Sequence, residues 1–134
     1  MISELTEFPV SSKTKKLVRR LNAEFLGLNL SGITFHEYDV DKSHTFKVMF
    51  SVARTQDIYL ERGNIPSAPD YAAFMLAHEV GHLRLGHFGS KKKPGEEFAA
   101  SHFAQGVIAG KIGPQAARRL ITRWVRDWLR IARR

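Results

Sequence analysis

The chain has 134 residues, contains no cysteine and carries a formal net charge of +8 at pH 7. This length supports one hydrophobic core but not two, so we expect residues 1–134 to form a single domain. The lack of cysteine excludes disulfides, thiolate catalysis and zinc sites built on thiolates. No apolar run reaches the ~20 residues that span a bilayer, and the first residues lack the pattern of a signal peptide. A cytoplasmic location is therefore expected.

The first half of the chain changes from helical to alternating periodicity. Apolar residues recur at helical spacing over 15–26, where Ser12 is a candidate N-cap and Gly27 follows the expected end. Apolar and polar residues then alternate over 33–38 and over 46–52, which predicts two strands.

Two further segments complete the expected sheet. The polar stretch 39–45 joins the first two strands and is suited to a hairpin, and a third short strand is predicted over 57–62. Helices follow for the rest of the chain. The order of elements predicts an α+β domain in which helices pack against a small antiparallel or mixed three-stranded sheet.

A largely apolar helix is predicted after the third strand. Pro69 and Asp70 mark its start and Gly86 marks its end. Gly81 lies inside this helix, where glycine costs up to ~1 kcal/mol relative to alanine. A residue without a side chain is useful where another element approaches closely, so we expect such an approach at Gly81.

This helix contains the pattern His-Glu-x-x-His, formed by His78, Glu79 and His82. Residues four apart lie one above the other on a helix, so both histidines can offer ring nitrogens to one Zn²⁺ ion. Glu79 lies beside the metal position, where its carboxylate can take a proton from a metal-bound water. Two core histidines beside a buried Glu79 are less favoured, because buried carboxylates are rarely left without a partner or a metal.

A zinc hydrolase needs a third protein ligand, and Glu97 is the first choice. It opens the next predicted helix, over 96–108. This helix follows a loop over 90–95 whose proline and glycine allow the chain to reverse. Ser101 lies one turn after Glu97 on the same face and is a candidate hydrogen-bond partner of a ligand.

Three other residues compete with Glu97 for this role. Glu96 is the nearest rival, although an exposed acid at a helix N-terminus explains it equally well. His87 qualifies as a ligand only if the helix that carries His78 and His82 breaks at Gly86. Otherwise we expect His87 to line the cleft beside the metal position. His102 is the remaining alternative.

The last predicted helix, at about 114–134, is amphipathic and strongly basic. It carries seven arginines and one aspartate, which supply +6 of the net charge of +8. Three interpretations stay open: packing on the core with a solvated arginine face, binding of nucleic acid or an acidic partner, and binding to a membrane surface.

The segment from 57 to 108 resembles the ImmA/IrrE-like metallopeptidases, which are small gluzincins. The matching residues are Ile58 to Leu60, Pro66, the stretch 74–87 with its His-Glu-x-x-His pattern, and Glu97, Ala100, Phe103 and Ala104. Ser101 stands where that family usually has asparagine. The resemblance implies a minimal gluzincin domain with a zincin-type metal helix, and a strand at 57–62 that borders the cleft and holds an extended peptide. Such relatives typically cleave repressors or other regulatory proteins.

Together these patterns predict a zinc-dependent endopeptidase acting on a specific cytoplasmic protein, with His78, His82 and Glu97 on the metal and Glu79 as general base. Candidates for an oxyanion donor are His87, His102, Arg84 and Tyr71. The alternative is a non-catalytic regulator on the same scaffold that binds nucleic acid or a partner through its basic helix. A metal-dependent hydrolase of a non-peptide substrate is a third hypothesis.

Overall fold

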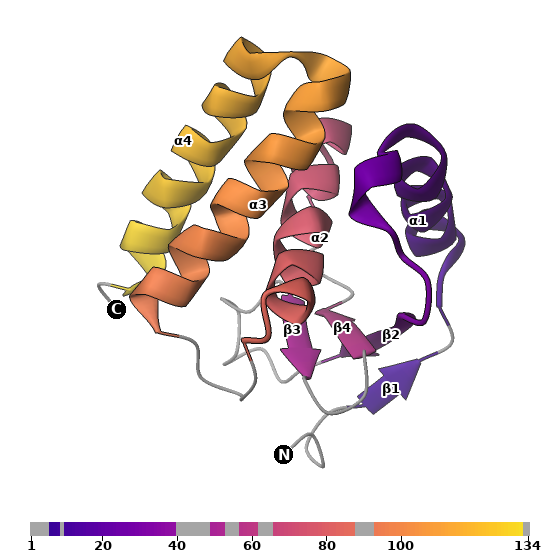
Figure 1. Ribbon diagram of the computed structural model, residues 1–134. Coiled ribbons are helices and arrows are strands. Elements are labelled where there is room, and N and C mark those ends of the chain that lie inside the picture. Colours follow the sequence, from indigo (N-terminus) through magenta and orange to yellow (C-terminus); the bar gives the residue numbers. More distant parts are fainter. Residues whose placement is uncertain are drawn as a thin grey trace.

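The computed structural model describes residues 6–8, 10–39, 49–52, 57–61, 66–87 and 93–132. Helices and strands both occur in these ranges, so the α+β class is confirmed (Figure 1). In chain order the elements are β1 (Thr6–Phe8), α1 (Ser12–Glu24), the 3₁₀ turn η1 (Leu26–Leu28), β2 (Thr34–Asp39), β3 (Met49–Val52), β4 (Asp57–Glu61), α2 (Pro69–Arg84), α3 (Pro94–Ile112) and α4 (Pro114–Ala132).

The sheet has four strands in the order β1-β2-β4-β3, one more than predicted. β1 and β2 are antiparallel, with Thr6 opposite Asp39. β2 and β4 are parallel, and β3 and β4 are antiparallel. The sheet is therefore mixed, and the prediction of three strands was wrong because the three residues of β1 are too few to display an alternating pattern.

The predicted hairpin between the second and third strands of the chain is also wrong. β4 lies between β2 and β3, so these two strands do not pair. Ile58 and Leu60 of β4 are fully buried, which suits a strand at the centre of a sheet. The connection predicted to form the hairpin turn lies outside the described residues, except for Asp39.

The central position of β4 corrects a second expectation, which was that this strand accepts an extended peptide along its edge. Both edges of β4 are already paired, one with β2 and the other with β3. A peptide that adds to a sheet needs an unpaired edge. The edge strand near α2 is β3, because β3 contacts this helix and ends the strand order.

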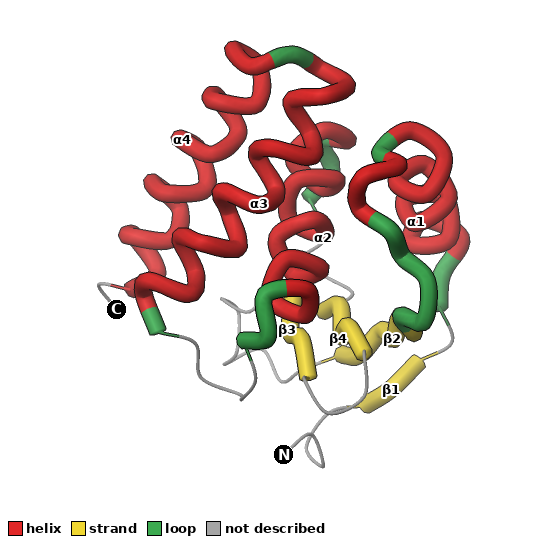
Figure 2. Tube along the Cα trace, in the orientation of Figure 1, coloured by secondary structure: helices red, strands yellow, loops and turns green. Residues whose placement is uncertain are grey.

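All four helices gather on one side of the sheet, as Figure 2 shows. α2 lies in the middle, with α1 on one flank and α3 and α4 on the other (Figure 1). Twelve residues of α2 are buried, so the helix is covered around most of its circumference. Its largest buried apolar side chain, Phe74, joins residues from every flanking helix in one core. The predicted metal helix is thus the central element of the domain.

The first helix is capped by Ser11 rather than by Ser12. Ser11 Oγ accepts a hydrogen bond from the Thr14 backbone N–H at 3.3 Å. Ser11 Oγ also donates to Glu37 Oε1 at 2.6 Å, and the Thr14 hydroxyl donates to the same oxygen. Glu37 is fully buried on β2. The cap is therefore selected by a tertiary contact with the sheet, which local periodicity does not contain.

The basic helix α4 packs on the domain with one face. Ala117 and Trp124 are buried, while all five of its described arginines, at 118, 119, 123, 126 and 130, are exposed. The packing interpretation of this helix is thus confirmed for its apolar face. No helix among the described residues combines the length and apolar character needed to cross a bilayer.

Candidate metal centre

The end of α2 is shaped by a glycine that turns the chain back on the helix. Gly86 has φ of 73°, a left-handed conformation that glycine adopts without strain. The Gly86 N–H donates to Leu83 O at 3.3 Å and the His87 N–H donates to His82 O at 2.9 Å, the two bonds of a Schellman motif. This turn returns His87 to the side of His82.

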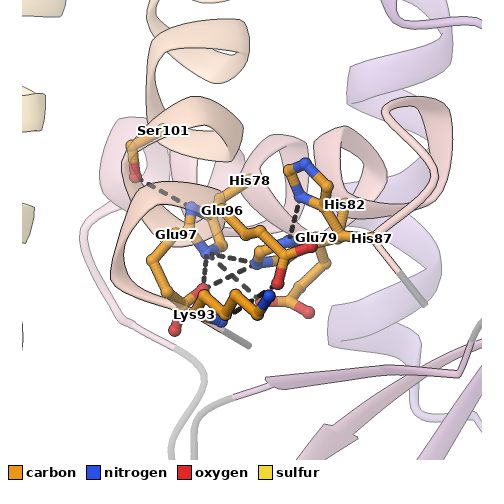
Figure 3. A network of polar contacts seen from close by, with 8 residues as sticks. All are labelled: His78, Glu79, His82, His87, Lys93, Glu96, Glu97 and Ser101. Carbon is orange, nitrogen blue, oxygen red and sulfur yellow. Dashed lines mark hydrogen bonds and ion pairs between the residues drawn. The ribbon is translucent and has the colours of Figure 1, made fainter. Parts of the chain in front are cut away.

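Three side-chain atoms from α2 and α3 converge on one point. His78 Nε2 and His82 Nε2 lie 3.1 Å apart. Glu97 Oε1 lies 3.2 Å from His78 Nε2 and 2.7 Å from His82 Nε2. Figure 3 shows the two imidazoles and the carboxylate directed toward one another. Both histidines are almost completely buried, at 3% and 1% exposed.

This donor set fits a zinc ion. Imidazole nitrogen and carboxylate oxygen are ordinary zinc ligands, with bonds of about 2.0–2.2 Å. At the corners of a tetrahedron, atoms bound at such distances are separated by roughly 3.3–3.6 Å. The separations of 3.1 and 3.2 Å are close to these edges, and the 2.7 Å separation between His82 Nε2 and Glu97 Oε1 is shorter by about 0.6 Å or more. Binding of the ion would therefore move the Glu97 carboxylate and the His82 ring apart.

The other ring nitrogens of both histidines also have partners. His78 Nδ1 lies 2.8 Å from Ser101 Oγ, and His82 Nδ1 lies 3.0 Å from His87 Nδ1. With a metal bound, a proton on each ligand Nδ1, donated to these partners, would leave both Nε2 lone pairs free to bind the ion. Ser101 and His87 thus favour the tautomers that metal binding requires.

A close crossing of α2 and α3 at Gly81 makes this arrangement possible. A Cβ atom added to Gly81 would lie 3.0 Å from Phe103 Cδ1 and 3.1 Å from Ala100 O. The close approach expected at this glycine is therefore present. It brings Glu97 and Ser101, which are one turn apart on α3, to the face of α2 that carries the histidines.

Glu96, the nearest rival of Glu97, is engaged at the start of α3. Its Oε1 accepts a hydrogen bond from the Lys93 backbone N–H at 3.0 Å. An acidic side chain that returns to the N-cap backbone stabilises the first turn of a helix. The structure thus brings Glu97 to the two imidazoles and assigns Glu96 to the helix end.

Glu79 lies beside the three converging atoms and does not join them. Its Oε2 is 3.8 Å from His78 Nε2, and the residue is 7% exposed. His78, Glu79 and His82 offer metal-ligating atoms that all lie within 4.8 Å of one another. A carboxylate held at this distance can contact a water on the metal without displacing it.

The charge of Glu97 suits a ligand. Burial raises the pKa of its carboxyl, but hydrogen bonds to His78 and His82 and the charge on these rings outweigh burial and lower the pKa to about 2. The group is therefore ionised at neutral pH, as a carboxylate ligand must be.

The other residues considered for this site lie in different places. Tyr71 donates its hydroxyl to Asp127 Oδ2 at 2.9 Å, and the Arg84 guanidinium donates to the backbone oxygens of Asn29 and Ser31. His102 is exposed. Of the four expected oxyanion donors, His87 contacts a residue of the candidate metal centre, through His82 Nδ1 at 3.0 Å.

Sequence reasoning missed one neighbour of the site, Trp124 on α4. Its ring centroid lies 5.2 Å from that of His78. The tryptophan falls on the apolar stripe of an amphipathic helix, and that pattern indicates burial without indicating which residue it packs against.

Searches of this chain against protein-family models, curated proteins and solved structures find no match. The interpretation of the centre accordingly depends on its own geometry.

Proposed function

We propose that the protein is a zinc-dependent endopeptidase. The observation that carries the proposal is the convergence of His78 Nε2, His82 Nε2 and Glu97 Oε1, with the buried carboxylate of Glu79 next to them. Three protein ligands leave a fourth position for water, which distinguishes a catalytic zinc site from a structural site closed by four ligands.

The chemistry divides between the ion and the protein. Bound zinc would polarise a scissile carbonyl and lower the pKa of its water toward ~7. Glu79 would take the proton of the attacking water and pass it to the leaving amine. Ser101 and His87 hold the two ligand imidazoles in orientation.

An extended peptide is the substrate that best suits the sheet. β3 contacts α2, and no strand in the described part of the chain pairs with its outer edge. A peptide that added antiparallel or parallel to β3 would run alongside the helix that carries His78 and Glu79. This edge takes the role that the sequence resemblance had assigned to the segment of β4.

The resemblance to ImmA/IrrE-like enzymes supports a gluzincin domain and, as a substrate, a regulatory protein. The pairing of a His-Glu-x-x-His helix with a glutamate on the next helix is the arrangement that resemblance implies for His78, His82 and Glu97. The proposed compartment is the cytoplasm, because a sequence without cysteine suits a reducing environment in which disulfides do not form.

Cleavage of a mixed protein extract tests the proposal. Zinc-loaded wild type and Glu79→Gln protein would be incubated with an extract, and newly formed N-termini would be labelled and sequenced. We expect new termini with a common flanking pattern in the wild-type sample and at least ~10²-fold fewer with Glu79→Gln, the scale of a lost general base. Equal numbers in both samples would refute catalysis by this centre, and none in either would favour the non-catalytic regulator.

A further inference from the structure

An open groove lies between α3 and α4, on a different face of α3 from the metal centre. Its apolar lining consists of Phe98 from α3 and of Ile121, Val125 and Leu129 from α4. The three α4 residues follow one another at intervals of four, so they form a continuous ridge of about 12 Å along the helix. Leu129 is 40% exposed, which is unusual for a large aliphatic side chain on a helix that packs on the domain.

Positive charge borders this apolar lining. Arg126 and Arg130 follow the ridge on α4, and His102 faces them from α3. Arg130 donates to Asp127 Oδ1 at 2.8 Å and keeps a side chain that is 69% exposed. Arg126 is exposed, and no acidic side chain among the described residues pairs with it. α4 carries five described arginines and one aspartate, so the groove lies in a strongly positive field.

We propose that this groove binds an acidic amphipathic helix of a partner protein. The apolar ridge matches a helix with leucine-like side chains at i, i+4 and i+7, which is the spacing of a helix that docks in a groove. Carboxylates beside that apolar face would meet Arg126 and Arg130, whose guanidinium groups can bind a carboxylate through two parallel hydrogen bonds. The proposal concerns binding alone and does not depend on the proposed catalysis.

The same surface suits nucleic acid and membranes less well. A nucleic-acid backbone offers phosphates and sugars but no apolar side for Ile121, Val125 and Leu129 to cover. A membrane interface is usually anchored by exposed aromatic rings, but Trp124 is 4% exposed. Trp124 and Trp128 stack on each other and contact Phe98, so both rings belong to the packing under the groove.

Fluorescence anisotropy with a designed helix tests the proposal. The probe is a labelled peptide of ~15 residues, about four helical turns, with leucines at i, i+4 and i+7 and glutamates on the flanking positions. We expect saturable binding to the wild-type protein that weakens about ten-fold in Arg126→Glu and in Leu129→Gln, since one removes the charge match and the other the apolar contact. Both residues are exposed, so circular dichroism should show an unchanged fold.

Arg19→Glu is the matched control. It makes the same charge change at an exposed residue of α1, which lies on the other flank of α2 (Figure 1). We expect less than a two-fold effect, because α2 lies between α1 and the groove (Figure 1) and 0.1 M salt screens exposed charges that are more than about 10 Å apart. Equal weakening by Arg19→Glu and Arg126→Glu would overturn the proposal, since it would show attraction by net charge alone.

Three further probes complete the test. A peptide with lysine in place of each glutamate should not bind. Duplex DNA and phosphatidylserine-containing vesicles are added in excess, and their binding to the protein should not be weakened by Leu129→Gln. Absence of binding by the acidic peptide, or tighter and Leu129-dependent binding of the vesicles, would show that the groove does not select an acidic helix.

Discussion

The indole ring of Trp124 lies against the imidazole of His78, with ring centroids 5.2 Å apart and planes inclined by 38°. Trp124 belongs to α4, whereas His78 belongs to α2, so the basic C-terminal helix forms part of the surroundings of the candidate metal centre. His78 is thus held on two sides, by Trp124 and by the hydroxyl of Ser101 on α3. Packing of this kind fixes the orientation of a ligand ring before a metal binds.

Trp124→Phe should therefore weaken zinc binding without abolishing it. We expect a loss of about ten-fold in affinity, the lower end of the range for residues that orient a ligand. Trp128→Phe is the matched control, because Trp128 stacks on Trp124 and has no described contact with His78. In that control Trp124 is the sole tryptophan, and its emission should change on addition of zinc. Emission that does not respond to zinc would contradict the proximity of the metal to Trp124.

Zinc itself should bind in a ratio of about one ion per chain, because the three converging ligands form one site. His78→Ala and His82→Ala should each remove the ion, as measured by elemental analysis after reconstitution and dialysis. Ala substitution at His36, which pairs with Asp57 on β4 at 2.9 Å, serves as the histidine control and should leave the zinc content unchanged. Full zinc content in both ligand variants would place the metal elsewhere.

Glutamate variants should separate the roles of three neighbouring carboxylates. Glu79→Gln should retain zinc and lose at least ~10²-fold in turnover, whereas Glu97→Gln should lower the affinity for zinc itself. Glu96→Gln should retain zinc and cost up to about 1 kcal/mol in unfolding free energy, through a weaker helix cap. Calorimetric zinc titration and thermal unfolding measure these effects. If Glu97→Gln bound zinc with normal affinity and Glu96→Gln bound it more weakly, Glu96 would be the metal ligand and Glu97 would not.

Gly81→Ala should destabilise the protein although alanine favours a helix. The new methyl group would lie 3.0 Å from Phe103 and 3.1 Å from the backbone oxygen of Ala100, and such overpacking typically costs 1–3 kcal/mol. Gly106→Ala on α3 is the control, because a Cβ there meets nothing within 4 Å. It should stabilise the protein by up to ~1 kcal/mol through helix propensity. Chemical denaturation measures the change in unfolding free energy of each variant. A change of the same sign in both variants would contradict the close crossing of α2 and α3 at Gly81.

The hydroxyl of Tyr71 should lose its proton at a higher pH than that of an ordinary tyrosine. Burial raises the pKa of its hydroxyl, and the hydrogen bond to Asp127 raises it further. The folded-state pKa is raised, so the stabilisation from this group is complete below the unfolded value of about 10 and is lost as the pH rises toward the folded value. Ultraviolet absorbance during an alkaline titration should show that one of the three tyrosines ionises at a higher pH than the others. Tyr71→Phe should remove this high-pH transition.

The helices were largely predictable because each has a periodic pattern or clear end signals. Pro69 and Gly86 bracket α2, and the apolar stripe of α4 is regular. The pairing of the strands was not predictable, since alternation indicates a strand without naming its neighbours. For the same reason the sequence left Glu96 and Glu97 as rivals. A shift of one residue rotates a side chain by 100° around a helix, and only the crossing at Gly81 fixes which carboxylate meets the histidines.

The place of β4 in the sheet has a consequence for how the chain is made and folds. β3 is synthesised before β4, yet β4 is its only neighbour in the strand order, so β3 has no described partner strand until the segment 57–61 has emerged. β2 likewise gains its parallel neighbour only then. β4 therefore makes two pairings of different range: its antiparallel pairing with β3 joins residues as few as five positions apart (Val52 with Asp57), whereas its parallel pairing with β2 joins residues 23 positions apart (Thr34 with Asp57). Less local pairings form more slowly, so the contact between β4 and β2 is the slower of the two to form. Ile58 and Leu60, buried at that position, are the side chains whose arrival joins the two halves of the sheet.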